Sequence, residues 1–341
     1  MKIGVIGDCH FKDSLSYADY IKDGRRTEKK EVLDFVIKSF KDCDHIVFLG
    51  DNFNSKNNSS ETNREFVEFL ERLGNKELYI ISGNHEKKGD GKTAIDFLGE
   101  VKKPNWHIFT TPGTITVAGV TETLKLDFLP YVLNSELEVE NSEEATKYLM
   151  KYLSGGDILF THHNITGTSF NGITTDILKG VVLPKEKLEK KYKLIVAGDI
   201  HVPQEYGKVI IAGSLFTSEV GEHEKFIWKI DDDMKVKKIK VPGREIHKLE
   251  NPTLKQLTAL PKDSIVKIIV TDKKIDLEEL EIVASGFDAY LLIIDYPDQR
   301  KKMKIEKGAF DFSIDALLHL YATEKNIDYQ QLKKGLELIN A

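Results

Sequence analysis

The run KIGVIGDCH (residues 2–10) decides the fold, because a short apolar segment ends in a glycine and is followed at once by an aspartate and a histidine. Four later apolar runs also end in polar residues, namely Gly50-Asp51-Asn52, Gly83-Asn84-His85-Glu86, Thr161-His162-His163 and Gly198-Asp199-Ile200-His201. Short, continuous, β-branched runs are typical of buried strands. The pattern predicts an α/β sheet in which each strand ends at a polar loop.

Five strands are predicted from these runs, at Lys2–Gly7, His45–Leu49, Leu78–Ser82, Ile158–Thr161 and Leu194–Ala197. Between the early strands, apolar residues recur at helical spacing, in the sets Val32, Phe35, Val36, Phe40 and Phe66, Phe69, Leu70, Leu73. Thr62 and Glu65 form a capping-box pattern before the second set. Residues 114–120 and 123–129 predict two strands joined by a tight turn, so we expect mixed sheets covered by helices.

The pattern divides the chain into three parts. It resets at Asn251-Pro252-Thr253, so residues 1–245 are expected to form the first domain. Residues 252–300 contain a strand, a helix and a strand, which predicts a small α+β capping domain. Residues 308–341 carry two helical patterns and predict a helical tail. The strand, helix and strand of the capping domain are expected at 265–271, 277–284 and 290–295.

Composition narrows the class of protein. A chain of 341 residues that is 40% hydrophobic can bury a sizeable core. No stretch approaches the roughly 18 apolar residues that a membrane span needs, and the N-terminus lacks a signal-peptide pattern, so we expect a cytoplasmic protein without a membrane partner. Two cysteines are too few for a disulfide framework. A net charge of −6 excludes coating of nucleic acid by bulk positive charge, although it leaves room for local basic patches.

The residues at the strand ends have the chemistry of a metal site. Loops at the carboxyl ends of strands meet in one crevice, so side chains that are far apart in the sequence can converge there. Carboxylate oxygens, imidazole nitrogens and an amide oxygen suit Mn²⁺, Fe²⁺ or Zn²⁺ better than Ca²⁺. The number of ligands predicts two ions. Two ions about 3.5 to 4 Å apart activate a bridging water and neutralise a phosphate, which indicates phosphoester hydrolysis.

In their order, the five motifs resemble the signature of the calcineurin-like metallophosphoesterases: D-x-H, G-D-x-x, G-N-H-[DE], a histidine after a strand, and G-x-x-H. The resemblance implies a four-layer sandwich of mixed sheets flanked by helices. It also implies that Asp8, His10 and His201 bind one metal ion. Asp51 would bridge to a second ion, which Asn84 and His162 would also bind.

The resemblance further implies that His85 stays off the metals, contacts the scissile phosphate and helps the leaving oxygen depart. Glu86 is expected to orient His85. His163 is the alternative to His162 as ligand, because adjacent residues point in different directions, and the motif favours His162. Cys9 is expected to face the core.

One position departs from the family pattern, because Asp199 stands where the last motif commonly has a histidine. A carboxylate ligand at this position favours two Mn²⁺ ions, with Mg²⁺ as the alternative. The competing interpretation is that Asp199 only hydrogen-bonds a metal-bound water.

The run 198–204, the Ala212-Gly213-Ser214 that follows, the cap and the tail resemble the SbcD-like nuclease subunit of SbcCD-type DNA repair exonucleases. The short chain resembles a phage-encoded member. The resemblance implies a homodimeric DNA exonuclease and endonuclease in repair, recombination or degradation, whose C-terminal helices dock on an SbcC-like SMC-type ATPase. Lys238 and Lys240, on one face of a predicted strand, are expected to contact DNA.

Two other functions are compatible with the same sequence. A stand-alone phosphatase or phosphodiesterase would use the cap to shape a pocket for a small phosphoester. A scaffold subunit, with catalysis weakened by Asp199, would mainly hold ATPase subunits together. For the tail helices, the alternative to docking on the ATPase is a hairpin packed on their own cap.

Overall fold

Two six-stranded sheets form the centre of the computed structural model, which describes residues 1–18, 24–88, 91–119, 122–170, 173–174, 180–220, 222, 224–287 and 289–296. The first sheet has the strand order β16-β15-β1-β2-β3-β4. Its strands are β1 (Lys2–Ile6), β2 (His45–Phe48), β3 (Glu77–Ile81), β4 (Trp106–Phe109), β15 (Phe226–Asp231) and β16 (Val236–Lys240). Strands β1 to β4 are parallel, so the polar residues that follow β1, β2 and β3 emerge at the same edge.

The second sheet has the strand order β13-β14-β12-β7-β6-β5. Its strands are β5 (Gly113–Ala118), β6 (Thr123–Leu129), β7 (Gly156–Thr161), β12 (Tyr192–Ala197), β13 (Gln204–Tyr206) and β14 (Val209–Ile211). Strands β6, β7, β12 and β14 are parallel, and β5 and β13 are antiparallel to their neighbours. The antiparallel pair β5 and β6 confirms the two adjacent strands predicted from the sequence.

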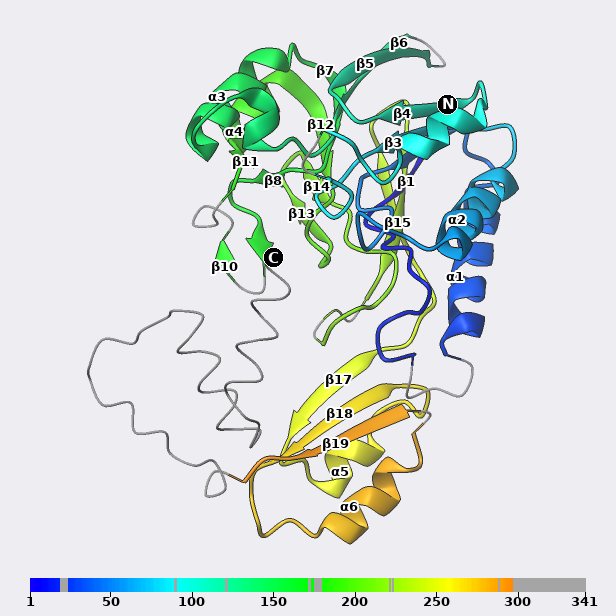
Figure 1. Ribbon diagram of the computed structural model, residues 1–341, viewed down its shortest axis with the longest axis vertical. Helices are drawn as coiled ribbons and strands as arrows, with labels where there is room; N and C mark the ends of the chain where they lie inside the picture. The colour runs from blue at the N-terminus through cyan, green and yellow to red at the C-terminus, as the bar shows by residue number, and fades with distance from the viewer. Residues whose placement is uncertain are drawn as a thin grey trace, which may run out of the picture. The chain divides into compact units, whose positions relative to one another are not determined.

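The two sheets pack face to face with helices outside them (Figure 1). Alternation along each strand produces this arrangement, because Ile46 and Phe48 face the helices while Val47 faces the other sheet. Helices α1 (Arg26–Ser39) and α2 (Ser60–Arg72) cover the first sheet. Helices α3 (Ser142–Tyr152) and α4 (Lys185–Lys191) cover the second. The predicted four-layer α/β sandwich is therefore confirmed.

Helix α2 begins earlier than the capping-box pattern predicted. Ser59 is its N-cap, and its hydroxyl accepts a hydrogen bond from the Thr62 amide at 3.0 Å. Thr62 is buried and donates to Asp13, while Glu65 pairs with Lys29. The prediction that Thr62 and Glu65 form the cap was wrong because Ser59 fills that position three residues upstream.

A third sheet contains the parallel strands β17 (Ile246–Glu250), β18 (Ile265–Val270) and β19 (Ala289–Ile294). Helix α5 (Leu254–Thr258) lies between β17 and β18 in the chain, and helix α6 (Leu277–Ala284) lies between β18 and β19. The strand, helix and strand predicted for the cap are present. Strand β17 was not predicted, because its alternating apolar and polar residues lie where the domain boundary was expected. The predicted tail, residues 308–341, lies outside the described residues.

The remaining short elements lie between the larger ones along the chain. They are η2 (Asp96–Val101), η3 (Asn134–Leu137), β8 (Asn164–Ile165), β9 (Ser169–Phe170), β10 (Ile173–Thr174) and β11 (Val182–Leu183). Among the described residues, none of the helices combines the length and the apolar composition that crossing a membrane requires.

Candidate metal centre

Residues from both sheets meet at the carboxyl ends of their parallel strands. The residues that the sequence singled out are Asp8 and His10 after β1, Asp51 after β2, Asn84 and His85 after β3, His162 after β7, and Asp199 and His201 after β12. All of them except the buried Asp8 and His162 line one pocket of about 900 Å³. Asp8 and His162 lie at its floor, where their side chains contact other members of the group.

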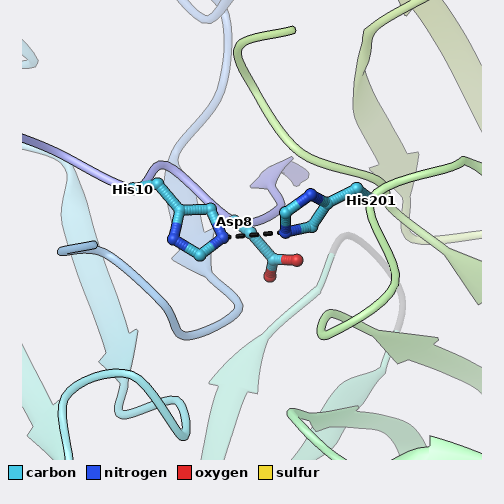
Figure 2. A group of neighbouring side chains, drawn as sticks. All are labelled: Asp8, His10 and His201. Atoms are coloured by element: carbon cyan, nitrogen blue, oxygen red, sulfur yellow. Dashed lines mark hydrogen bonds between the residues drawn. The ribbon is translucent and has the colours of Figure 1, made fainter. Parts of the chain in front are cut away.

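Asp8, His10 and His201 form the first half of this cluster, and Figure 2 shows their side chains. Their ligand-type atoms lie within 4.8 Å of one another. The two imidazole rings point toward one another, with 2.9 Å between His10 Nε2 and His201 Nε2. Burial lowers the pKa of His10 to about 3. Its imidazole is therefore neutral at physiological pH, which is the form that binds metal ions.

The Asp8 carboxylate is fully buried, and burial raises its pKa to about 7. One of its oxygens, Oδ1, accepts a hydrogen bond from the Asp199 amide at 3.2 Å. For the other oxygen, Oδ2, the described residues supply no hydrogen-bond partner. A buried carboxylate oxygen without a donor is costly, and a cation removes that cost. This group of donors therefore fits a divalent ion.

Asn84, His162 and Asp199 form the second half of the cluster. His162 donates from Nδ1 to the Leu49 carbonyl at 2.6 Å, so its Nε2 is the ring nitrogen that faces the cluster. That nitrogen lies 3.0 Å from the Asn84 amide and 3.8 Å from Asp199 Oδ1. Asn164 donates to the other oxygen of Asp199 at 2.5 Å. The carboxylate that replaces the family histidine thus points into the cluster.

Asp51 lies between the two halves. Its Oδ2 is 3.8 Å from His10 Nε2 and its Oδ1 is 3.5 Å from His162 Nε2. Burial acts to raise the pKa of Asp51, but the neighbouring His162 and His10 outweigh burial and lower it to about 2. Asp51 is therefore a carboxylate that faces both groups of donors.

The backbone around the cluster adopts conformations that cost energy. His10, Asp51 and Asp199 have φ angles of 46°, 44° and 71°, in the left-handed region that non-glycine residues rarely occupy. Glycines provide the space between the loops. A Cβ atom at Gly83 would lie 2.1 Å from Asp51 Oδ1, and one at Gly50 would lie 2.4 Å from His162 Nδ1. Backbone strain of this kind is concentrated at functional sites.

His85 lies at the edge of the cluster, where 45% of its side chain is exposed. Its Nδ1 is 3.1 Å from the Asn54 carbonyl, and its Nε2 is 3.8 Å from Asp51 Oδ2. The ligand-type atoms of His10, Asp51 and His85 also lie within 4.8 Å of one another. His85 therefore presents one ring nitrogen to the pocket, beside Asp51.

Glu86 turns inward and does not orient His85. Its carboxylate accepts hydrogen bonds from the Gly83 amide at 2.8 Å and the Phe53 amide at 3.1 Å. Burial raises the pKa of Glu86 to about 7. The prediction for Glu86 was wrong because the side chain joins the loops after β2 and β3.

His163 and Cys9 both point away from the cluster. His163 stacks on Tyr131 at 5.1 Å and accepts a hydrogen bond from the Val132 amide at 3.3 Å. Burial lowers the pKa of His163 to about 3. Cys9 is fully buried in the core, as expected, and burial raises the pKa of its thiol well above the usual value. Of the two adjacent histidines, His162 is the one within the cluster.

The two lysines that were expected to contact DNA are paired with carboxylates. Lys238 Nζ lies 3.7 Å from the Glu205 carboxylate and 4.1 Å from the centre of the Phe226 ring. Lys240 Nζ lies 2.9 Å from Glu224 Oε1. Contact between these lysines and DNA stays a prediction.

Two residues of the site were missed by the sequence analysis. Glu222 contacts His201 through a 2.7 Å hydrogen bond, and Asn164 contacts Asp199. Glu222 belongs to no strand-end motif, so the sequence contained no pattern that could identify it. Asn164 directly follows His162 and His163, and a polar residue next to a ligand motif was the only indication available.

A family model described as calcineurin-like phosphoesterase matches residues 1–203. Among solved structures, the chain is similar to a dimetal phosphatase from Danio rerio, with 13% identity, a TM-score of 0.43, and coverage of 71% of this chain and 96% of that one. It is also similar to Vps29 from Chaetomium thermophilum, with 13% identity, a TM-score of 0.29 and the same coverage, 71% and 96%. The search of curated proteins found no match.

Proposed function

This chain belongs to the calcineurin-like phosphoesterase family, and from that premise we propose that it is a two-metal phosphodiesterase that cleaves DNA. Membership of this family makes the protein a hydrolase of phosphoesters. The observation that carries the proposal is the double cluster itself, two groups of buried and half-buried donors that share Asp51 in a wide pocket with His85 at its edge. Such an arrangement suits an in-line displacement at phosphorus.

Each half of the cluster would hold one divalent ion. Asp8, His10 and His201 would bind the first, with Asp51 shared between the two. The second would be bound by Asn84, His162 and Asp199. Mn²⁺ is the expected ion and Mg²⁺ the alternative, because oxygen donors predominate in the second half. When bound, the ions supply an activated water and neutralise phosphate charge.

His85 is proposed as the catalytic residue. Its side chain is exposed in the pocket and its Nδ1 faces the Asn54 carbonyl, so Nε2 can reach a bound phosphoester. From there an imidazole can donate a proton to the leaving oxygen or stabilise its charge.

Two features of the pocket support the proposal of a diester substrate. A phosphomonoester carries a charge of about −1.5 to −2 at neutral pH, and proteins commonly bind such groups with arginine or lysine. Beside the proposed ions, Lys12 is the single lysine or arginine among the described residues that line the pocket, and Glu219 adds negative charge. A volume of about 900 Å³ is also near the upper end of the ~300 to 1,000 Å³ typical of small-molecule sites.

DNA and the ATPase partner enter the proposal through the resemblance of residues 198–204 and 212–214, the cap and the predicted tail to SbcD-like nuclease subunits. In this proposal the helices predicted within 308–341 dock on an SbcC-like SMC-type ATPase, and the nuclease acts as a homodimer. Lys238 and Lys240 would add contacts to the DNA backbone.

The decisive experiment compares substrates. The purified chain is incubated with end-labelled duplex and single-stranded DNA, bis-p-nitrophenyl phosphate and p-nitrophenyl phosphate, each with Mn²⁺, Mg²⁺ or chelator. We expect Mn²⁺-dependent cleavage of DNA and of the diester. Hydrolysis of the monoester alone would establish the stand-alone phosphatase instead. Absence of hydrolysis together with tight binding to an SbcC-like ATPase would favour the scaffold.

A further inference from the structure

A buried pair of charged residues holds the backbone and the ring of His201. Glu222 is 7% exposed and lies beyond residues 1–203, the part of the chain that the family model matches. Its Oε1 accepts a hydrogen bond from His201 Nδ1 at 2.7 Å. Its Oε2 accepts from the Ser218 amide at 2.8 Å and from Lys225 Nζ at 2.9 Å. Both oxygens of this carboxylate are thus fully engaged.

Lys225 is the second residue of this charged pair. It is 4% exposed, and its ammonium group donates to Ser214 Oγ at 2.6 Å and to the His201 carbonyl at 3.2 Å. All three of its protons therefore have acceptors, counting Glu222. A buried ion pair adds little net stability, because desolvation offsets the attraction between the charges. Its geometry indicates a role in placing His201.

The direction of the hydrogen bond determines the tautomer of His201. An ionised carboxylate can only accept, so His201 Nδ1 carries a proton, and the lone pair of the neutral ring is then on Nε2. Nε2 faces His10 Nε2, 2.9 Å away, beside the Asp8 carboxylate. Without Glu222, the ring could rotate or take the other tautomer.

We propose that Glu222 is a positioning residue that fixes the tautomer and the orientation of His201 for metal binding, and that Lys225 balances the buried charge of Glu222. The inference rests on the metal-binding role proposed for His201. Partners of this kind commonly change metal affinity about 10-fold to 100-fold. Neither residue contacts the substrate in this scheme.

The first test reads the tautomer directly in the unchanged protein. Nitrogen NMR of the full chain in chelator, at a pH where the His201 ring is neutral and with its resonances assigned against a His201→Ala variant, is expected to show a protonated Nδ1 and an unprotonated Nε2. The opposite tautomer in the wild-type protein would overturn the inference. This measurement needs no active enzyme and no altered Glu222.

The second test measures Mn²⁺ binding by calorimetry. Glu222→Ala is expected to weaken one of two ions about 10-fold to 100-fold, whereas Glu222→Gln, which keeps an oxygen acceptor, should stay within about threefold of wild type. Glu219→Ala is the matched control, because Glu219 is an exposed glutamate that lines the same pocket. If Glu222→Ala does not fold, the Glu222→Gln, Lys225→Met double variant removes both charges together and should still bind two ions.

The outcomes separate this inference from the proposed function. If His201→Ala loses one ion while Glu222→Ala binds both with wild-type affinity, the positioning role is wrong and the metal site stands. If neither variant changes Mn²⁺ binding, the metal-binding role of His201 is itself wrong. Loss of the second ion in the double variant would show that the charges, rather than the acceptor oxygen, are required, and would also overturn the proposal.

Discussion

The two halves of the cluster are built from similar donors but are held in place differently. In the first half, Glu222 fixes the ring of His201 through a carboxylate at 2.7 Å. In the second half, His162 is fixed by the backbone carbonyl of Leu49 at 2.6 Å, and Asp199 is fixed by the Asn164 side chain. A backbone acceptor is available whatever the side chain is, whereas a carboxylate acceptor depends on one residue. His201 is therefore more sensitive than His162 to substitution outside the ligands.

The largest effect is expected from Asp51→Asn, because Asp51 is the residue that both halves share. An amide removes the negative charge between the two groups, so both ions should bind more weakly. We expect the rate of hydrolysis of bis-p-nitrophenyl phosphate to fall ~10³-fold. Metal content and initial rates check this. Asp157→Asn is the control, because the Asp157 carboxylate on β7 pairs with Lys193 outside the cluster. Retention of two tightly bound ions would show that Asp51 does not connect the halves.

His85→Asn should separate catalysis from metal binding. His85 reaches the pocket but stands at the edge of the cluster, so its loss should lower the rate about 10²-fold and leave two ions bound. Rates at saturating Mn²⁺ and calorimetric stoichiometry measure the two quantities. His107→Asn is the control, because His107 is a partly exposed histidine that pairs with Glu77. Loss of an ion in the His85 variant would assign His85 to the first half instead.

His163, which follows His162 of the second half, should make the stability of the metal-free protein sensitive to acid. The pKa of buried His163 is about 3, against an ordinary value of 6.5. Below pH 6.5 the unfolded chain binds a proton here that the folded chain does not bind until about pH 3. Stability is therefore complete above pH 6.5 and falls as the pH falls through this window. His163 should account for ~2 kcal/mol between pH 7 and pH 5.

Urea unfolding in chelator at several pH values checks this prediction. His163→Gln keeps an acceptor for the Val132 amide but cannot titrate, so its free energy of unfolding should change less between pH 7 and pH 5. Equal pH dependence in both proteins would show that His163 is not responsible.

The smallest effect is expected from Asp199→His, which restores the common family residue in the second half. An imidazole in place of a carboxylate should shift the preference from Mn²⁺ toward Zn²⁺ by about tenfold. Competition between the two ions, followed by elemental analysis, measures the shift. An unchanged ratio would favour the alternative in which Asp199 only hydrogen-bonds a metal-bound water.

Much of the fold could be predicted because it depends on local patterns. Apolar runs such as 45–49 and 78–82 are strands in the structure within about a residue or two, since burial on both faces requires such runs. Strand β17 and the start of α2 could not be predicted in the same way. In both cases a local pattern was ambiguous, and pairing with β18 or capping by Ser59 decided the outcome.

The kinds of ligand and their order follow from the sequence alone. So does the convergence of Asp8, Asp51 and Asn84, because parallel strands place their carboxyl ends at one edge of the sheet. The use of each side chain depends on tertiary contacts. His162 faces the cluster while His163 faces Tyr131, and Glu222 lies 21 residues beyond His201 in a loop without periodicity. Such contacts depend on chain segments meeting in space, and no local sequence pattern records that meeting.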